Sequence, residues 1–402
     1  MRPKQIFQAA GHQMGTATDD RKWHSVNIAG SGRNHRLDGL RGYAALAVAV
    51  FHTILSIDES LVNRIVYGNA ANFHDSYSWF AKVTLKLFSG ETAVFIFFVL
   101  SGAVLSRSLI QVRSPFFLQA SDFTVKRAFR IFPALLLNLL VMAACLAAVG
   151  KPVTAGDFVV NALLLKFPIN GATWTLNVEM IAVLFILAAY AGWCLAREWG
   201  LIVASIALDI LLQFSISKSL VPLFRDQWTL FALGMLIPTG VGWWITRRMP
   251  LASAPLVLLV AIALKGTIQP VAIAIFVALL YYNRAGKLGA FLEKPFSRYL
   301  GRISYSFYLY NPVVLCLIAE YPARWPLAHS HPIEIGLLVA FPVVLATMCL
   351  AHASTRYVEQ PAIALGRSLA LRIGVGHHSN LATPSAVAAP NASHSLEREA
   401  VW

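Results

Sequence analysis

Two side chains able to do chemistry lie in one apolar segment near the start of the chain. Arg41 stands close to the beginning of this segment, and His52 follows eleven residues later. In an α-helix eleven steps of 100° return to within about 20° of the starting direction, and they advance about 16 Å along the axis. The spacing therefore predicts that Arg41 and His52 share one helix face at different depths.

His52 is a stronger indication of a functional site than Arg41. An arginine at the end of a membrane span can extend its guanidinium into the interface, so Arg41 alone has a simple explanation in membrane topology. A histidine inside a span is costly unless it faces a cavity or a partner. Because imidazole titrates near neutral pH, His52 is a candidate general base.

A second group of ionisable residues occurs further along the chain. Arg127 and Arg130 are spaced i and i+3, so they share a helix face, and two guanidinium groups suit phosphate oxygens. An excess of cytoplasmic arginine would also explain them. Glu179 is expected at the depth of His52, where a carboxylate could fix the imidazole tautomer, or else serve only in packing. Glu91 could pair with Arg41 or cap a broken helix.

The composition indicates a membrane protein. Of the 402 residues, 57% are hydrophobic and only 13% are charged, whereas soluble domains carry about 25% charged residues. Apolar runs long enough to cross a bilayer recur along the chain. The net charge of +14 is attributed mainly to cytoplasmic loops, and no nucleic-acid partner is expected.

The fold expected is all-α, a polytopic membrane helical bundle of about ten transmembrane helices. The segment 158–167 is too short to span and is interpreted as interfacial or re-entrant. The predicted spans are 40–57, 80–106, 128–149, 174–193, 199–216, 223–245, 251–264, 268–283, 300–319 and 333–353.

Charge placement predicts the orientation. Lys and Arg concentrate in alternate connections, as the positive-inside rule requires if both termini are cytoplasmic. The intervening connections carry fewer of them, for example only Arg64 in 58–79.

The chain divides into three expected parts. Residues 1–35 form a polar cytoplasmic segment without a cleavable signal, 36–367 form the membrane domain, and 368–402 form a disordered cytoplasmic tail. The four cysteines lie in apolar stretches without CxxC spacing, so no metal site is expected.

Six segments in order resemble the acyltransferase 3 family, and the likeness covers about residues 36–367. The first contains Arg41 and His52, and the others include the arginine pair and Glu179. They read LDGLRGYAALAVAVFH (37–52), GETAVFIFFVLSGAVL (90–105), KRAFRIFP (126–133), WTLNVEM (174–180), LGRISYSFYLYNP (300–312) and RYVEQP (356–361).

The resemblance implies a membrane-bound enzyme that moves an acyl group, by default acetyl, from cytoplasmic acyl-CoA to a hydroxyl of a glycan. It implies catalytic roles for His52, Arg41 and Glu179, and donor binding by Arg127, Arg130 and Arg41. Family members often have histidine where this chain has Asn311, and an amide cannot relay a proton at neutral pH. The implied location is a bacterial inner membrane, in contact with membrane lipids.

Several alternatives stay open. The acceptor could be a lipid, a small molecule or a Nod-type oligosaccharide, and a separate extracytoplasmic partner could finish the transfer. Transfer could be direct or pass through an acyl-histidine. A protein of another class, a transporter, could also use charged residues inside spans.

Overall fold

The computed structural model describes residues 34–68, 73, 75–111, 115–214, 221–318 and 325–378, with side chains to residue 372. Every regular element within these ranges is helical, which confirms the all-α prediction for this part of the chain. Helix α3 (His35–Ile57) begins where Asn34 accepts hydrogen bonds from the amides of Arg36 and Leu37. Such an asparagine satisfies amides that the first helical turn leaves free.

Five helical stretches in the described ranges are long and apolar enough to cross a membrane, and two bent pairs raise this number to seven. The five stretches are His35–Ile57, Ser76–Gln111, Phe116–Ala148, Gly171–Leu212 and Pro332–Arg372. Side chains such as Leu140, Leu184 and Phe341 stand exposed on them, as lipid-facing residues do. The protein is therefore a multi-pass membrane protein, while ten spans and the placement of the termini stay predictions.

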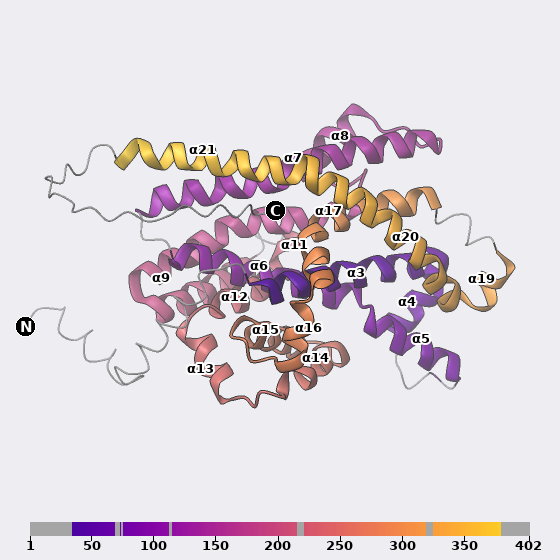
Figure 1. Cartoon of the computed structure of the whole chain (residues 1–402), viewed down its shortest axis with the longest axis horizontal. Helices are drawn as coiled ribbons and strands as arrows, with labels where there is room; N and C mark the ends of the chain where they lie inside the picture. Colours follow the sequence, from indigo (N-terminus) through magenta and orange to yellow (C-terminus); the bar gives the residue numbers. More distant parts are fainter. Residues whose placement is uncertain are drawn as a thin grey trace, which may run out of the picture.

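One predicted span, 223–245, is sharply broken, and the span predicted at 268–283 ends at a second sharp bend. The segment 223–245 forms α11 (Pro222–Arg225), α12 (Trp228–Leu236) and α13 (Gly240–Arg248), with a 78° bend between the last two. Helix α15 (Ile268–Tyr281) is bent by 77° from α16 (Gly286–Leu292), and α14 (Ser253–Ala263) has only 11 residues. Helices α13 to α16 gather in one part of the molecule (Figure 1). The chain therefore changes direction sharply twice in this region, while α14 and α15 coincide with the segments predicted at 251–264 and 268–283.

The helix labelled α9 (Trp174–Leu212) contains two helices joined by a tight reversal. Ala196 and Arg197 have non-helical dihedral angles, and a Cβ atom added to Gly192 would meet Ala204. A straight helix would hold those two residues about 18 Å apart. The geometry agrees with the separate segments predicted at 174–193 and 199–216.

The predicted span 80–106 also has an internal break. Helix α5 (Ser76–Leu87) ends just before α6 (Gly90–Gln111) begins. A short helix, α4 (Glu59–Tyr67), follows α3 and packs on α5. Residues predicted inside a span, including Lys82 and Lys86, therefore belong to α5 rather than to the long helix α6.

Helix α3 lies at the centre of the packing, against α6, α17 (Pro295–Ile318) and α20 (Pro332–Ser354). Gly42 and Gly301 allow α3 and α17 to touch through their backbones, and Gly102 and Gly234 do the same for α6 and α12. Small residues permit such approach in membrane proteins, where packing replaces the hydrophobic effect between helices. These contacts fix the depth and direction of Arg41 and His52.

A buried asparagine network holds the segment before α9. The predicted interfacial or re-entrant segment 158–167 begins within the short helix α8 (Ala155–Ala162), and the turn η2 (Gly171–Thr173) follows it. The side-chain amides of Asn138 and Asn170 donate to the carbonyl of Leu309, at 2.9 and 3.1 Å, and Asn161 accepts from the amides of Ile169 and Asn170. This network ties α7 (Phe116–Ala148), η2 and α17 together.

The C-terminal part is helical further than predicted. After a π-helical turn at Thr355–Glu359, α21 (Gln360–His378) runs alongside α7 (Figure 1). Helix thus continues eleven residues into the segment 368–402 that was expected to be a disordered tail. Residues 379–402, like residues 1–33, lie outside the described ranges.

We predict that Gly102→Ala lowers the free energy of unfolding by about 1–3 kcal/mol, since the new methyl group would collide with the α12 backbone at Phe231. The matched control is Gly156→Ala on the exposed face of α8, where the added methyl group would meet only the Thr154 hydroxyl, at an ordinary contact distance of 3.7 Å. It should be neutral or slightly stabilising. Thermal unfolding in detergent measures both, and equal stabilities would contradict the packing described for α6 and α12.

Candidate active site

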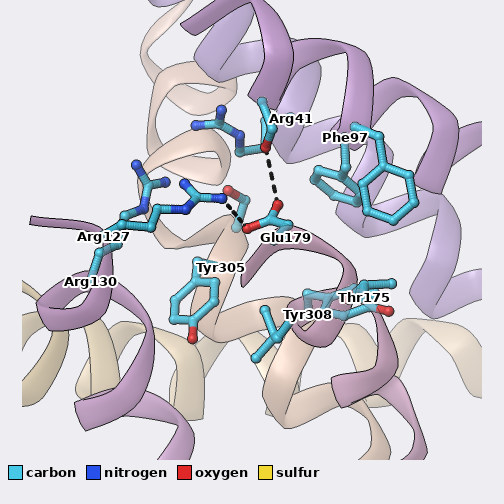
Figure 2. Close-up of a pocket in the computed structure, with 12 residues that line it drawn as sticks. Arg41, Phe97, Arg127, Arg130, Thr175, Glu179, Tyr305 and Tyr308 are labelled. Atoms are coloured by element: carbon cyan, nitrogen blue, oxygen red, sulfur yellow. Dashed lines mark hydrogen bonds and ion pairs between the residues drawn. The ribbon is translucent and has the colours of Figure 1, made fainter. Parts of the chain in front are cut away.

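Four of the five predicted site residues meet in one cavity. Arg41 of α3, Arg127 and Arg130 of α7 and Glu179 of α9 line it, as Figure 2 shows. The space between its walls is about 550 Å³. We call it the arginine pocket; its remaining lining is Phe97, Phe98, Ser101, Thr175, Leu176, Ser304, Tyr305 and Tyr308.

Glu179 is held at the centre of the arginine pocket. Its carboxylate forms an ion pair with Arg127 (Figure 2). It also accepts a hydrogen bond of 3.1 Å from the Ser101 hydroxyl. The side chains of Arg127 and Glu179 are 7% and 19% exposed, so little water competes with the pair. A buried charge is tolerated when it is paired in this way.

The expected partnership between Glu179 and His52 is not formed. Glu179 pairs with Arg127, and the His52 ring bonds to the carbonyl of Val48 instead. Glu179 lines the arginine pocket together with Arg41, whereas His52 lines a different cavity. The prediction that Glu179 sets the histidine tautomer is therefore wrong for this conformation.

The arginine pocket carries excess positive charge. Arg41 and Arg130 make no hydrogen bond or ion pair with any side chain that the structure describes; their interactions with Glu179, Glu359 and Asp38 are electrostatic only. Glu359 lies buried behind the pocket and accepts from Ser306 at 2.9 Å and Thr355 at 3.2 Å. Three guanidinium groups and one carboxylate thus face the cavity, an arrangement that favours a polyanion.

His52 lines a second cavity, of about 1160 Å³, which we call the histidine cavity. Its Nδ1 atom lies 3.0 Å from the Val48 carbonyl oxygen. Because a carbonyl can only accept, Nδ1 must carry the proton, and a neutral imidazole then has its lone pair on Nε2. His52 is therefore held in the tautomer that a general base needs.

The two cavities share one wall. Tyr308 of α17 lines both, and its ring packs edge-on against Phe97 with centroids 6.0 Å apart. The Tyr308 hydroxyl donates to the Ala172 carbonyl at 3.1 Å, so the asparagine network that holds η2 also holds this tyrosine. Trp174 faces the histidine cavity while its neighbour Thr175 faces the arginine pocket.

Glu91 and Asn311 lie outside the arginine pocket. Glu91 is exposed in the first turn of α6, 4.0 Å from the Lys265 ammonium, and so does not pair with Arg41. Asn311 is buried, and neither of its side-chain atoms has a hydrogen-bond partner in the described structure.

Sequence reasoning missed several residues of the site. Ser101 appeared only as a letter of the motif 90–105, yet its hydroxyl donates to the Glu179 carboxylate. Tyr305 and Tyr308 were seen only as letters of a motif, although their spacing of three already placed them on one helix face. Lys82 and Lys86 lie on α5 and line the histidine cavity, although no motif or spacing in the sequence indicated this.

Comparison with known proteins gives the family. The family model described as an acyltransferase domain, the acyltransferase 3 model, matches residues 34–354, which include every residue that lines the two cavities. The chain belongs to the acyltransferase 3 family. The resemblance seen in the six sequence motifs is thereby confirmed.

One curated relative of this acyltransferase is nodulation protein 10 of Rhizobium leguminosarum bv. viciae. It is 24% identical over 398 residues, covering 86% of this chain and 98% of the relative. No solved structure matches the chain. Family membership and the helical architecture together make this protein a membrane acyltransferase.

We predict strong energetic coupling between Arg127 and Glu179. Arg127→Gln or Glu179→Gln alone should lower the free energy of unfolding by about 3 kcal/mol, because each leaves an unpaired buried charge. The loss of unfolding free energy in the double variant should be smaller than the sum of the two single losses, by a coupling energy of about 1–3 kcal/mol. Denaturation in mixed micelles measures the cycle, with Lys126→Gln and Asp122→Asn as the exposed control pair on α7. Additive losses would contradict the central ion pair.

Proposed function

We propose that this acyltransferase moves an acyl group, with acetyl as the default, from cytoplasmic acyl-CoA to a hydroxyl of an extracytoplasmic or lipid-linked glycan. The observation that carries the proposal is the contact between the two cavities at Tyr308: a cationic pocket adjoins a cavity containing a histidine in its basic tautomer. A donor and an acceptor can enter from different sides and meet at that wall.

The donor side is the arginine pocket. Coenzyme A carries a diphosphate and a ribose phosphate, and guanidinium groups bind such oxygens through paired hydrogen bonds. Arg41 and Arg130 are free of protein hydrogen bonds in the described structure, so their donors are available. Arg127 is already paired with Glu179, so it would hold the Glu179 carboxylate in position rather than bind phosphate itself.

The acyl arm would extend from the arginine pocket towards His52. The two ends of this path lie about 16 Å apart along α3, a length suited to the pantetheine arm rather than to the acetyl group alone. Phe97 and Tyr308 line the route and form its apolar wall. A dry, aromatic passage would protect the thioester from water.

His52 then acts on the acceptor. Its Nε2 removes the proton of the acceptor hydroxyl as the oxygen attacks the thioester carbonyl; the new C–O ester bond forms, the C–S bond breaks, and His52 returns the proton to the coenzyme A thiolate. The Val48 carbonyl stabilises the protonated ring through Nδ1. The alternative is attack by Nε2 itself to give an acyl-histidine before the acceptor binds.

The acceptor is proposed by class only. A relative is named a nodulation protein, which keeps a Nod-type oligosaccharide as an alternative to a surface polysaccharide, a lipid or a small molecule. The proposed location is the inner membrane with both termini cytoplasmic, and a separate extracytoplasmic transferase could receive the acyl group. Family membership favours an acyltransferase over a transporter.

We predict that His52→Ala and His52→Gln in membranes supplied with labelled acetyl-CoA reduce transfer by about 10²–10⁴-fold, the usual contribution of a general base. Labelled glycan is the readout. His329→Gln, an exposed histidine of α19 (Pro326–Ser330), is the matched control and should transfer normally. Transfer at near wild-type rates in the His52 variants would show that the base is a different residue.

We predict that Arg130→Gln raises the KM for acetyl-CoA about tenfold, since one charged contact to phosphate is lost. With acetyl-pantetheine, which lacks the nucleotide phosphates, the same variant should behave as wild type. Arg302→Gln, on an exposed face of α17, controls for general charge effects. An equal loss with both donors would mean that Arg130 does not bind the nucleotide.

A further inference from the structure

Three lysines surround the histidine cavity. Lys82 and Lys86 come from α5, and Lys265 follows α14, so segments far apart in the sequence bring three ammonium groups to one opening. We call them the lysine cluster. Neither the family motifs nor the mechanism proposed above uses them.

Each lysine is oriented by backbone carbonyls at a helix end. Lys82 donates to the Ile65 carbonyl at 2.6 Å, and Lys265 donates to the Val66 carbonyl at 3.3 Å, both near the end of α4. Lys86 donates to the carbonyls of Ile262 and Ala263 at 3.3 and 3.1 Å, at the end of α14. These acceptors are neutral, so they fix the positions of the ammonium groups without cancelling their charge.

The lining is therefore cationic. Glu91 is the one carboxylate among the residues that line this cavity, and its nearest oxygen is 4.0 Å from the Lys265 ammonium. Three cations against one partly exposed anion leave an excess of two positive charges beside His52. An anion entering the cavity would relieve the repulsion among the lysines.

The rest of the lining suits a saccharide. Tyr67 is 80% exposed, with the Lys265 ammonium 5.7 Å from its ring centroid, and Trp174 lines the same cavity, so two aromatic side chains stand where sugar rings could pack. Gln227 Oε1 is buried in the same lining and has no hydrogen-bond partner in the described structure. A sugar hydroxyl could donate to this oxygen.

We propose that the lysine cluster is the acceptor-binding subsite, and that it selects an acidic saccharide, one with a carboxylate or phosphate near the hydroxyl that is acylated. This inference rests on the proposed function, which makes the histidine cavity the acceptor side. It goes further by specifying that the acceptor carries a negative charge. The lysines hold the acidic group at the opening while the saccharide's hydroxyl reaches His52. A neutral saccharide would lack this anchor.

The test is binding to the full chain in nanodiscs of phosphatidylcholine, which supply no anionic lipid. The probes are trigalacturonic acid as a carboxylate saccharide, galactotriose as its neutral counterpart, and galactose 1-phosphate against galactose for the phosphate source. We expect each acidic probe to bind about tenfold more tightly than its neutral counterpart. The reason is that the three lysines each make a weak, solvent-screened charge contact with the acidic group. This preference should shrink as salt rises.

The variant is Lys82→Gln/Lys86→Gln/Lys265→Gln. Glutamine keeps an N–H donor for the helix-end carbonyls and removes the charge, so the fold should be preserved. The matched control removes three lysines elsewhere that are exposed: Lys166→Gln/Lys287→Gln/Lys294→Gln. The cluster variant should lose the preference for acidic probes, and the control should keep it. Equal binding of acidic and neutral probes by wild type, or an unchanged preference in the cluster variant, overturns the proposal.

A second measurement separates this inference from the proposed function. In the transfer assay the cluster variant should raise the KM for an acidic acceptor about tenfold and leave kcat and the KM for acetyl-CoA unchanged. Transfer to neutral acceptors as efficient as to acidic ones, in both proteins, would refute the subsite and keep the acyltransferase mechanism. Selective binding without any thioester consumption would keep the subsite and refute the mechanism.

Discussion

Three arginines inside an apolar helix bundle constrain this structure. A guanidinium group keeps its charge even when buried, so it must find a partner or serve a ligand. Arg127 finds Glu179, which Ser101 also holds. Arg41 and Arg130 are left facing the same cavity with hydrogen-bonding capacity to spare in the described structure. The arrangement is costly for a bundle that only needs to be stable, and it is the arrangement expected where a polyanion binds.

Close helix packing places the three arginines in a cavity that lies next to the histidine cavity. The glycine contacts between α3 and α17, and between α6 and α12, bring five helices around the arginine pocket. His52 of α3 lines the histidine cavity, and Tyr308 of α17 lies between this cavity and the arginine pocket. The asparagine network holds η2, whose Ala172 carbonyl anchors that tyrosine. The residues that separate donor from acceptor are thus fixed by the same contacts that hold the fold.

Sequence reasoning predicted the parts of this site that depend on local spacing. Helical periodicity placed Arg41 and His52 on one face, as well as Arg127 and Arg130, and motif likeness identified Glu179 and the family. The ion-pair partner of Glu179 could not be predicted from the sequence. Whether Glu179 pairs with Arg127 or with His52 depends on how α7 and α9 pack. The bends after α12 and α15 were missed for a similar reason: hydropathy measures how apolar a segment is and not its direction. The lysines of α5 became visible only when the break before α6 was known.

The central claim is that donor and acceptor occupy separate cavities and meet at the Tyr308 wall. The most direct measurement is an experimental structure of the full chain with an acetyl-CoA analogue in which a methylene replaces the thioester sulfur. We expect nucleotide phosphates against Arg41 and Arg130, and an acetyl carbonyl that reaches past Phe97 and Tyr308 to the Nε2 side of His52. Phosphates bound among Lys82, Lys86 and Lys265, or an acetyl group that never enters the histidine cavity, would contradict it.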